Sequence, residues 1–348
     1  MSNHEELALL NKKLLENNIN TISAQLTGIP QSWQCRLPRH IINSVVLSYL
    51  EMHKAMYRRG VEILPNIHPF LSGGNLPPDG EAIVMALYSM RSVSNTIHHK
   101  SEPLATNTGR DSIRGPSITS IKKVMWQYLL APAPGFAYIL LDYSSQEPAI
   151  AACLANDLKL QSAAQEGKFY LHIRSHSNLA DLDDKTSKQH ALTYLYGQRP
   201  ESFAKEHHIP LMLVQRRWEA LREVFHQVDT ELNRRSQQAF QNGFVRSLDW
   251  AAWVPPLSNP LAVRNWPVQA AGADIMRRAV IGLAKEGIDL RLTIHDAFLI
   301  RVPIAKQDQQ VAKAIEVLKQ ASAMVLDGFK LNVKVDGIYD GQVSGEMM

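Results

Sequence analysis

Two short apolar runs, each ending in an aspartate, interrupt a hydrophobic pattern that is otherwise mostly helical. Residues 137–141 form an unbroken apolar run, which is typical of a buried strand. The run ends at Asp142, and Glu147 follows it. A second run ends at Asp296 and a third follows at once, which predicts a hairpin around Asp296. Because a sheet holds residues at strand ends rigidly, the two aspartates would meet if their strands are neighbours.

Elsewhere apolar residues recur every three or four positions, as in amphipathic helices. This spacing predicts helices over residues 5–26, 38–59, 81–96, 268–286 and 304–326. It also predicts a nearly continuous helical region over 149–242, with breaks at Gly167, 181–184, 197–200 and Pro210. Loops are expected at 66–80 and around Pro255, Pro256 and Pro260, and a last edge strand at 331–335. Few strands, split by a long helical insertion, indicate an α+β fold.

Composition narrows the class of protein only modestly. The 348 residues, 45% hydrophobic and 20% charged, are enough for several subdomains around an ample core. A net charge of +4 suits a nucleic-acid binder without requiring one. Two cysteines exclude a disulfide framework and a cysteine-rich zinc site. Since the sequence shows neither a membrane-length apolar run nor a secretory signal, we expect no membrane partner and a cytoplasmic location, either nucleoid-associated or as a phage or plasmid product.

Two further patterns lie between the aspartates. Lys188, Leu192 and Tyr196 are spaced by four and would share one helix face, where a lysine could hold a triphosphate and an aromatic ring could stack on a base. A solvent-facing lysine above a core tyrosine is the alternative. Asn265 and Gln269 stand at a predicted helix start, where amides either read minor-groove acceptors or cap the helix.

In this order, the motifs resemble the polymerase module of family A DNA polymerases, the bacterial DNA polymerase I type, over roughly residues 105–340. Asp142-Tyr143-Ser-Ser-Gln-Glu147 is similar to motif A, and Lys188 followed by Tyr196-Gly197 to motif B. His295-Asp296 is similar to motif C. Asn265-Trp-Pro-Val-Gln269 and Thr108-Gly109-Arg110 resemble two further segments of that family.

The resemblance implies a right-hand polymerase with an antiparallel palm sheet and helical thumb-like and fingers subdomains. It divides the chain into a helical thumb-like N-terminal subdomain (1–104), a palm (105–148 and 256–348) and helical fingers (149–255). It implies a DNA polymerase that adds dNTPs to the 3′-hydroxyl of a primer–template. We expect no proofreading, because no strand bearing Asp-x-Glu is evident in the first hundred residues. A processivity or replication partner is left unidentified.

The resemblance also implies residue roles. Asp142 and Asp296 would hold two Mg²⁺ ions, with Mn²⁺ as the alternative, and Lys188 would neutralise the triphosphate. Glu147 would exclude a 2′-hydroxyl and Tyr196 would pack beside the template base. The remaining substrate-binding residues it implies are Tyr143, Lys185, Leu192, Arg110, Asn265, Gln269 and His295, of which Arg110, Asn265 and Gln269 would bind the minor groove and His295 the primer end.

Four positions depart from that family, among them Pro148, which follows Glu147 where the family continues with an apolar residue and Arg. Asp184 stands where the family has a triphosphate-binding arginine, which predicts either weak dNTP binding or a substitute role for Lys185. Leu192 replaces an aromatic residue, and Ala297 replaces the glutamate of motif C. Two other functions therefore stay open: a single-subunit RNA polymerase of the phage type, against which Glu147 argues, and a DNA-binding accessory protein that has lost synthesis.

Other polar clusters are interpreted as surface features. Asp229 and Glu231 lie in a charged helical run, which indicates solvent exposure. His172 and His176 are spaced for zinc but lack an evident third ligand. A final set of arginines is interleaved with acids, as on a solvated face that could also contribute to template binding: Arg216, Arg217, Arg222, Arg234 and Arg235.

Overall fold

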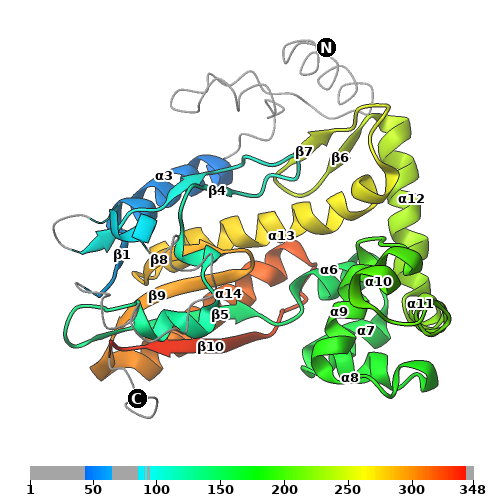
Figure 1. The fold of residues 1–348 in the computed structure, drawn as a ribbon. Helices are drawn as coiled ribbons and strands as arrows, with labels where there is room; N and C mark the ends of the chain where they lie inside the picture. Colours follow the sequence, from blue (N-terminus) through cyan, green and yellow to red (C-terminus); the bar gives the residue numbers. More distant parts are fainter. Residues whose placement is uncertain (1–43, 65–84, 90, 92–94, 342–348) are drawn as a thin grey trace.

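The computed structural model describes residues 44–64, 85–89, 91 and 95–341 (Figure 1). The helix predicted over 5–26 and the loop predicted over 66–80 lie outside these residues. Within them, no helix is both long and apolar enough to cross a bilayer.

A four-stranded antiparallel sheet lies at the centre of the fold, in the order β10-β5-β9-β8 (Figure 1). Its strands are β5 (Phe136–Tyr143), β8 (Asp289–Ile294), β9 (Ala297–Pro303) and β10 (Val333–Tyr339). The sheet confirms the predicted strand before Asp142 and the hairpin around Asp296. The predicted edge strand is also present, although it begins at Val333 and continues to Tyr339.

Both faces of the central strand β5 are buried, which explains its unbroken apolar sequence. Successive side chains point to opposite faces, so Ile139 and Leu141 enter the main core while Tyr138 and Leu140 enter a second cluster with Trp126. A fully buried leucine contributes about 2 kcal/mol to stability. The two cores therefore fix the strand that carries Asp142 from both sides.

Long helices cover the face of the sheet that belongs to the main core. Helix α13 (Pro260–Lys285) packs against α14 (Gln307–Val325) and against α3 (Ser44–Arg59). Figure 1 shows α13 running along the length of the sheet. α13 also contacts α6 (Gln146–Leu154), the helix that begins directly after β5. This packing joins the sheet to the helical region that follows.

The predicted helical region consists of short helices gathered beyond one end of the sheet (Figure 1). They are α6, α7 (Leu158–Gln165), α8 (Phe169–Arg174), α9 (Asp184–Leu195), α10 (Pro200–His207), α11 (Leu211–Val224) and α12 (His226–Asn242). The predicted breaks all lie at or beside helix ends, but the interruptions after α6 and after α11 were not predicted. α12 ends at Asn242, and the positive φ of 79° at its C-cap Gly243 favours glycine.

The short strands and the start of α13 differ from the sequence-based expectation. Three two-stranded sheets were not predicted: β1 (Val61–Glu62) with β2 (Thr96–Ile97), β3 (Lys100–Glu102) with β4 (Ser112–Arg114), and β6 (Phe244–Arg246) with β7 (Ala251–Trp253). The first hundred residues are therefore not purely helical. α13 begins at Pro260 rather than 268, with Asn259 as its N-cap. Asn265 and Gln269 consequently lie inside the helix and not at its start.

Candidate active site

The register of the central sheet brings the two predicted aspartates together. Asp142 in β5 pairs with Ala297 at the start of β9, and Asp296 is the residue before Ala297. The backbone amide of Tyr143 donates to the carbonyl of Asp296 at 3.4 Å. Both carboxylates line one groove of about 870 Å³. The pairing of the neighbouring strands β5 and β9 is therefore enough to bring the two aspartates to the same place.

The electrostatics of this pair favour a bound cation. Burial, together with the negative charge of Asp142, raises the pKa of Asp296 to about 7. The ammonium of Lys334 on β10 lies 3.1 Å from Asp142 Oδ2. When no metal ion is bound, a proton on Asp296 and the ammonium of Lys334 thus balance the negative charge of the site. A divalent cation would replace both.

The donor set suits Mg²⁺ better than a metal held entirely by protein. Nowhere in the described ranges do three or more His, Cys, Asp or Glu side chains form a group that could hold a metal ion. Mg²⁺ is usually bound by one or two carboxylates, by waters and by substrate phosphates. Two neighbouring carboxylates at an open groove fit that pattern.

The turn between β8 and β9 places His295 beside the aspartates. Ile294 pairs with Ala297, so the connection has only two residues. His295 has a φ of 52°, a left-handed conformation that costs a residue other than glycine about 1–3 kcal/mol. Its side chain borders both the groove and a second cavity. Two-residue hairpin turns require a positive φ, so the tight connection accounts for this conformation and fixes His295 at the edge of the groove.

Glu147 contacts two other predicted residues, which come from distant segments of the chain. It lies in the first turn of α6. Arg110 forms an ion pair with one of its oxygens, and the hydroxyl of Tyr196 donates to the other. Burial, followed by this hydrogen bond, raises the pKa of Tyr196. The carboxylate of Glu147 is therefore held at both oxygens beside the two aspartates.

Helix α9 supplies the opposite wall of the groove. Lys188, Leu192 and Tyr196 all line it, as their spacing predicts. Asp183 caps the helix by accepting from the amide of Thr186 at 2.6 Å. Lys185 also lines the groove. In the described part of the chain Lys188 has no salt bridge, which leaves its charge available to a ligand.

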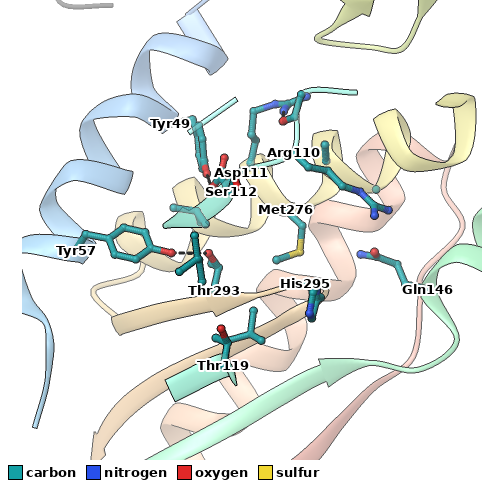
Figure 2. A pocket seen from close by; sticks show the side chains of 17 residues that line it. Tyr49, Tyr57, Arg110, Asp111, Ser112, Thr119, Gln146, Met276, Thr293 and His295 are labelled. Carbon is teal, nitrogen blue, oxygen red and sulfur yellow. Dashed lines mark hydrogen bonds between the residues drawn. The ribbon is translucent and has the colours of Figure 1, made fainter. Parts of the chain in front are cut away.

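A second cavity of about 340 Å³ lies between α3, α13 and the β8–β9 turn. Figure 2 shows Arg110 and Gln146 on one side of this cavity and Tyr49 and Tyr57 of α3 on the other. His295 lies at its lower edge. The cavity therefore continues the groove toward α3 and offers a path for an extended ligand.

Sequence analysis missed several residues of this cavity. Tyr49 donates to Asp111, which also accepts from the amide of Leu104 at 3.1 Å. Gln146 is buried, and its Nε2 has no partner among the described residues. None of these residues belongs to a spacing pattern, so only the contacts reveal them.

Asn265 and Gln269 lie deeper than predicted. Together with Glu147, Leu192 and Tyr196 they line a small pocket that adjoins the groove. Asn265 is buried, and Gln269 Oε1 accepts from the hydroxyl of Thr108 at 3.4 Å. Their positions inside α13 explain this burial.

Two predictions of exposed polar clusters are wrong. Asp229 is partly buried between Tyr194 and an ion pair with Arg264, because α12 packs on α13. Arg217 is buried as well, and its Nη2 lies 2.6 Å from Asp181 Oδ2. Neither residue reaches the groove.

The other polar clusters form ordinary ion pairs. His176 Nε2 lies 3.0 Å from Glu223, and His176 follows the end of α8 rather than continuing it. Arg234 and Arg235 pair with Glu231 at 2.6 and 2.7 Å. These contacts leave the groove as the main concentration of candidate functional residues.

Comparisons with known proteins found a matching family model and related sequences. The family model described as DNA polymerase family A matches residues 80–338. The chain is 23% identical over 249 residues to a DNA polymerase of Mycobacterium phage L5, covering 70% of this chain and 42% of that protein. It is 27% identical over 253 residues to a thermostable DNA polymerase I of Thermus thermophilus, covering 65% and 30%. The chain thus spans less than half of either relative.

A solved structure shows the same fold at low identity. It is the POL domain of Pol1 from M. smegmatis, in complex with DNA primer-template and dNTP. The TM-score is 0.65 at 19% identity, over 97% of this chain and 65% of that one. The likeness confirms the predicted α+β, right-hand polymerase fold.

Proposed function

Because the chain belongs to DNA polymerase family A, we propose that it is a template-directed DNA polymerase that adds dNTPs to a primer 3′-hydroxyl. The observation that supports this most directly is the in-register placement of Asp142 beside Ala297, which brings Asp296 to the same end of the sheet. The primer–template DNA and the dNTP are the partners this function requires. The palm would comprise residues 105–148 and 256–348, and the fingers 149–255, with 1–104 as a thumb-like subdomain.

Two Mg²⁺ ions, held by Asp142 and Asp296, would supply activation of the primer hydroxyl and stabilisation of the leaving pyrophosphate. The chain's own residues would do the rest. Lys188 would neutralise the triphosphate. Glu147, held by Arg110 and Tyr196, would lie beneath the sugar and exclude a 2′-hydroxyl.

The second cavity would hold the primer side of the duplex. Arg110 and His295 line it, and both offer donors to the primer end. Asn265 and Gln269 would reach the minor groove from α13. Tyr196 and Leu192, on the α9 wall, would flank the template base, and Tyr143 would support the floor of the site.

Primer extension with Mg²⁺, comparing dNTPs with rNTPs, tests the proposed function. The wild-type chain should extend with dNTPs, while Asp142→Asn and Asp296→Asn should still bind DNA but not extend it. Preferential use of rNTPs would favour the RNA polymerase alternative. Tight primer–template binding without extension would favour an accessory protein. The absence of proofreading stays a prediction, which incubation of a mispaired, labelled primer without dNTPs would test.

A further inference from the structure

The groove carries positive charge on its helical wall, opposite the aspartates. Lys168, Arg174, Lys185 and Lys188 line it from α8, α9 and the residue preceding α8. The two helices lie side by side in Figure 1. A polyphosphate in the groove would therefore direct its distal end toward α8 and α9. The inference below rests on the proposed function and concerns which residue binds that end.

Arg174 and Asp184 form an ion pair at this wall. Arg174 is the last residue of α8, and Asp184 is the first of α9. The Asp184 side chain is 82% exposed, whereas that of Arg174 is 25% exposed. Asp184 therefore points largely into solvent, and the side chain of Arg174 is the more buried partner.

The guanidinium still has donors to offer. Its Nη2 is paired with Asp184, and its Nη1 lies 3.5 Å from the carbonyl of Leu182, a long contact. Its Nε is buried and has no partner among the described residues, so a phosphate in the groove would be bound through the two Nη groups. A planar guanidinium at the edge of a groove can bind a phosphate through two parallel hydrogen bonds.

We propose that Arg174 binds the distal phosphates of the incoming dNTP and that Asp184 positions it. The sequence placed an acid at 184 where an arginine was expected, which raised the concern of an acid facing phosphates. The ion pair removes that concern, because Asp184 holds a guanidinium delivered from the neighbouring helix. An exposed ion pair contributes little by itself, so a phosphate can share the guanidinium without unfolding α8. Lys185 is then not the main replacement for the triphosphate-binding arginine of the family.

Binding of a complementary dNTP to the chain on a dideoxy-terminated primer–template tests this without turnover. Arg174→Met should weaken the dNTP Kd about 10- to 50-fold, as expected for loss of a charged bidentate contact. Arg174→Lys should recover part of that loss. Lys313→Met is the matched control, because its ion pair with Glu286 lies outside the groove and both partners are exposed; its Kd should stay within about twofold of wild type.

A charge exchange gives the sharper test. Arg174→Asp and Asp184→Arg should each change the Kd of the dNTP when made alone. The double variant should return this Kd to within about threefold of wild type, because it restores a guanidinium at the wall. Duplex affinity and circular dichroism verify that each variant is folded. If Arg174→Met misfolds, Arg174→Lys and the double variant still decide the question.

Two outcomes would overturn the proposal. One is an unchanged Kd in Arg174→Met, and the other is a larger loss in Lys185→Met than in Arg174→Met. Failure of the proposed function looks different. In that case the wild-type chain would not distinguish a complementary from a non-complementary dNTP on the terminated primer, whatever stands at residue 174.

Discussion

The two walls of the groove position their charges by different means. In the palm, Asp142 and Asp296 are placed by the backbone, because β5 and β9 are paired from Phe136 to Asp142 and both strands are buried. In the fingers, the cations are placed by side chains. Arg174 is held by an exposed aspartate, and Lys188 extends from one face of α9.

The difference explains which part of the site can vary in sequence. Moving a palm carboxylate would require a shift in strand register, which would turn every core side chain of the strand to the wrong face. Moving a fingers cation requires only a new side chain on a neighbouring helix that reaches the same space. The departures at Asp184 and Leu192 lie on the fingers wall. Ala297, at the start of β9 in the palm, departs from the family as well, but both aspartates are present there.

The largest expected effect comes from breaking the palm wall. Asp296→Asn should lower the extension rate by at least about 10³-fold, or about 4 kcal/mol in activation free energy, because a neutral amide is a poor ligand for Mg²⁺. Lys188→Met should act mainly on the dNTP Kd. Single-turnover extension across dNTP concentrations separates the two effects. Equal rate losses in both variants would contradict the division between the walls.

A second test concerns Glu147, which joins the two walls through its bonds to Arg110 and Tyr196. Glu147→Ala should reduce discrimination against rNTPs about 10- to 100-fold, because nothing would then occupy the space beneath the sugar. Tyr196→Phe removes one hydrogen bond to Glu147 and keeps the ring, so its effect should be smaller. The ratio of kcat/KM for dNTP and rNTP measures both. Unchanged discrimination in Glu147→Ala would rule out the sugar-gate role.

A third test concerns Lys334, a cation placed by the palm sheet. It stands in register with Asp142 on β10. Although burial opposes it, the hydrogen bond to Asp142 raises the pKa of Lys334, so the lysine stays charged and competes with a metal ion. Lys334→Met should lower the Mg²⁺ or Mn²⁺ concentration needed for half-saturation about three- to tenfold.

Mn²⁺ binding followed by electron paramagnetic resonance measures this effect without turnover. Lys330→Met is the control, because Lys330 pairs with Glu316 and does not line the groove. Weaker metal binding in Lys334→Met would show that the lysine supports the site instead of competing for it.

The parts of the site that sequence predicts are those fixed by periodic or motif patterns. The apolar run before Asp142, the hairpin around His295 and the shared face of Lys188 and Tyr196 each follow from spacing within one element. Burial on both faces of a strand or a repeat of four along a helix leaves a readable pattern.

The parts that sequence did not predict depend on contacts between elements. Arg174 and Asp184 belong to different helices, and Tyr49 and Asp111 are 62 positions apart in the sequence. The strands of two or three residues are too short to show a period of two. The early start of α13 was missed because Pro260 was taken for a loop residue, although proline is favourable in a first helical turn.

The smallest expected effect is an opposite response of the two walls to pH. In the fingers, burial lowers the pKa of His190, which is fully buried on α9. Its stabilising contribution is complete above about pH 6.5, the ordinary value for histidine, and is lost as the pH falls toward the folded-state pKa. In the palm, the pKa of Asp296 is raised from 3.8 to about 7, so its contribution is complete at low pH and is lost as the pH rises through 7. Without metal, acidification should therefore loosen α9 while the β5–β9 pair becomes more protected.

Hydrogen exchange at pH 5.5 and 7.5, corrected for the intrinsic rate, measures both responses in one experiment. His190→Gln should flatten the response of α9 alone, because the amide stays neutral at either pH, and Asp296→Asn should flatten that of the sheet alone. Mg²⁺ should restore protection of the sheet at pH 7.5 and leave α9 unchanged, because a cation compensates the two carboxylates but does not contact His190. If the protection of α9 and of the β5–β9 pair changed in the same direction with pH, the two walls would form one cooperative unit. That result would contradict the distinction between charges placed by the backbone and charges placed by side chains.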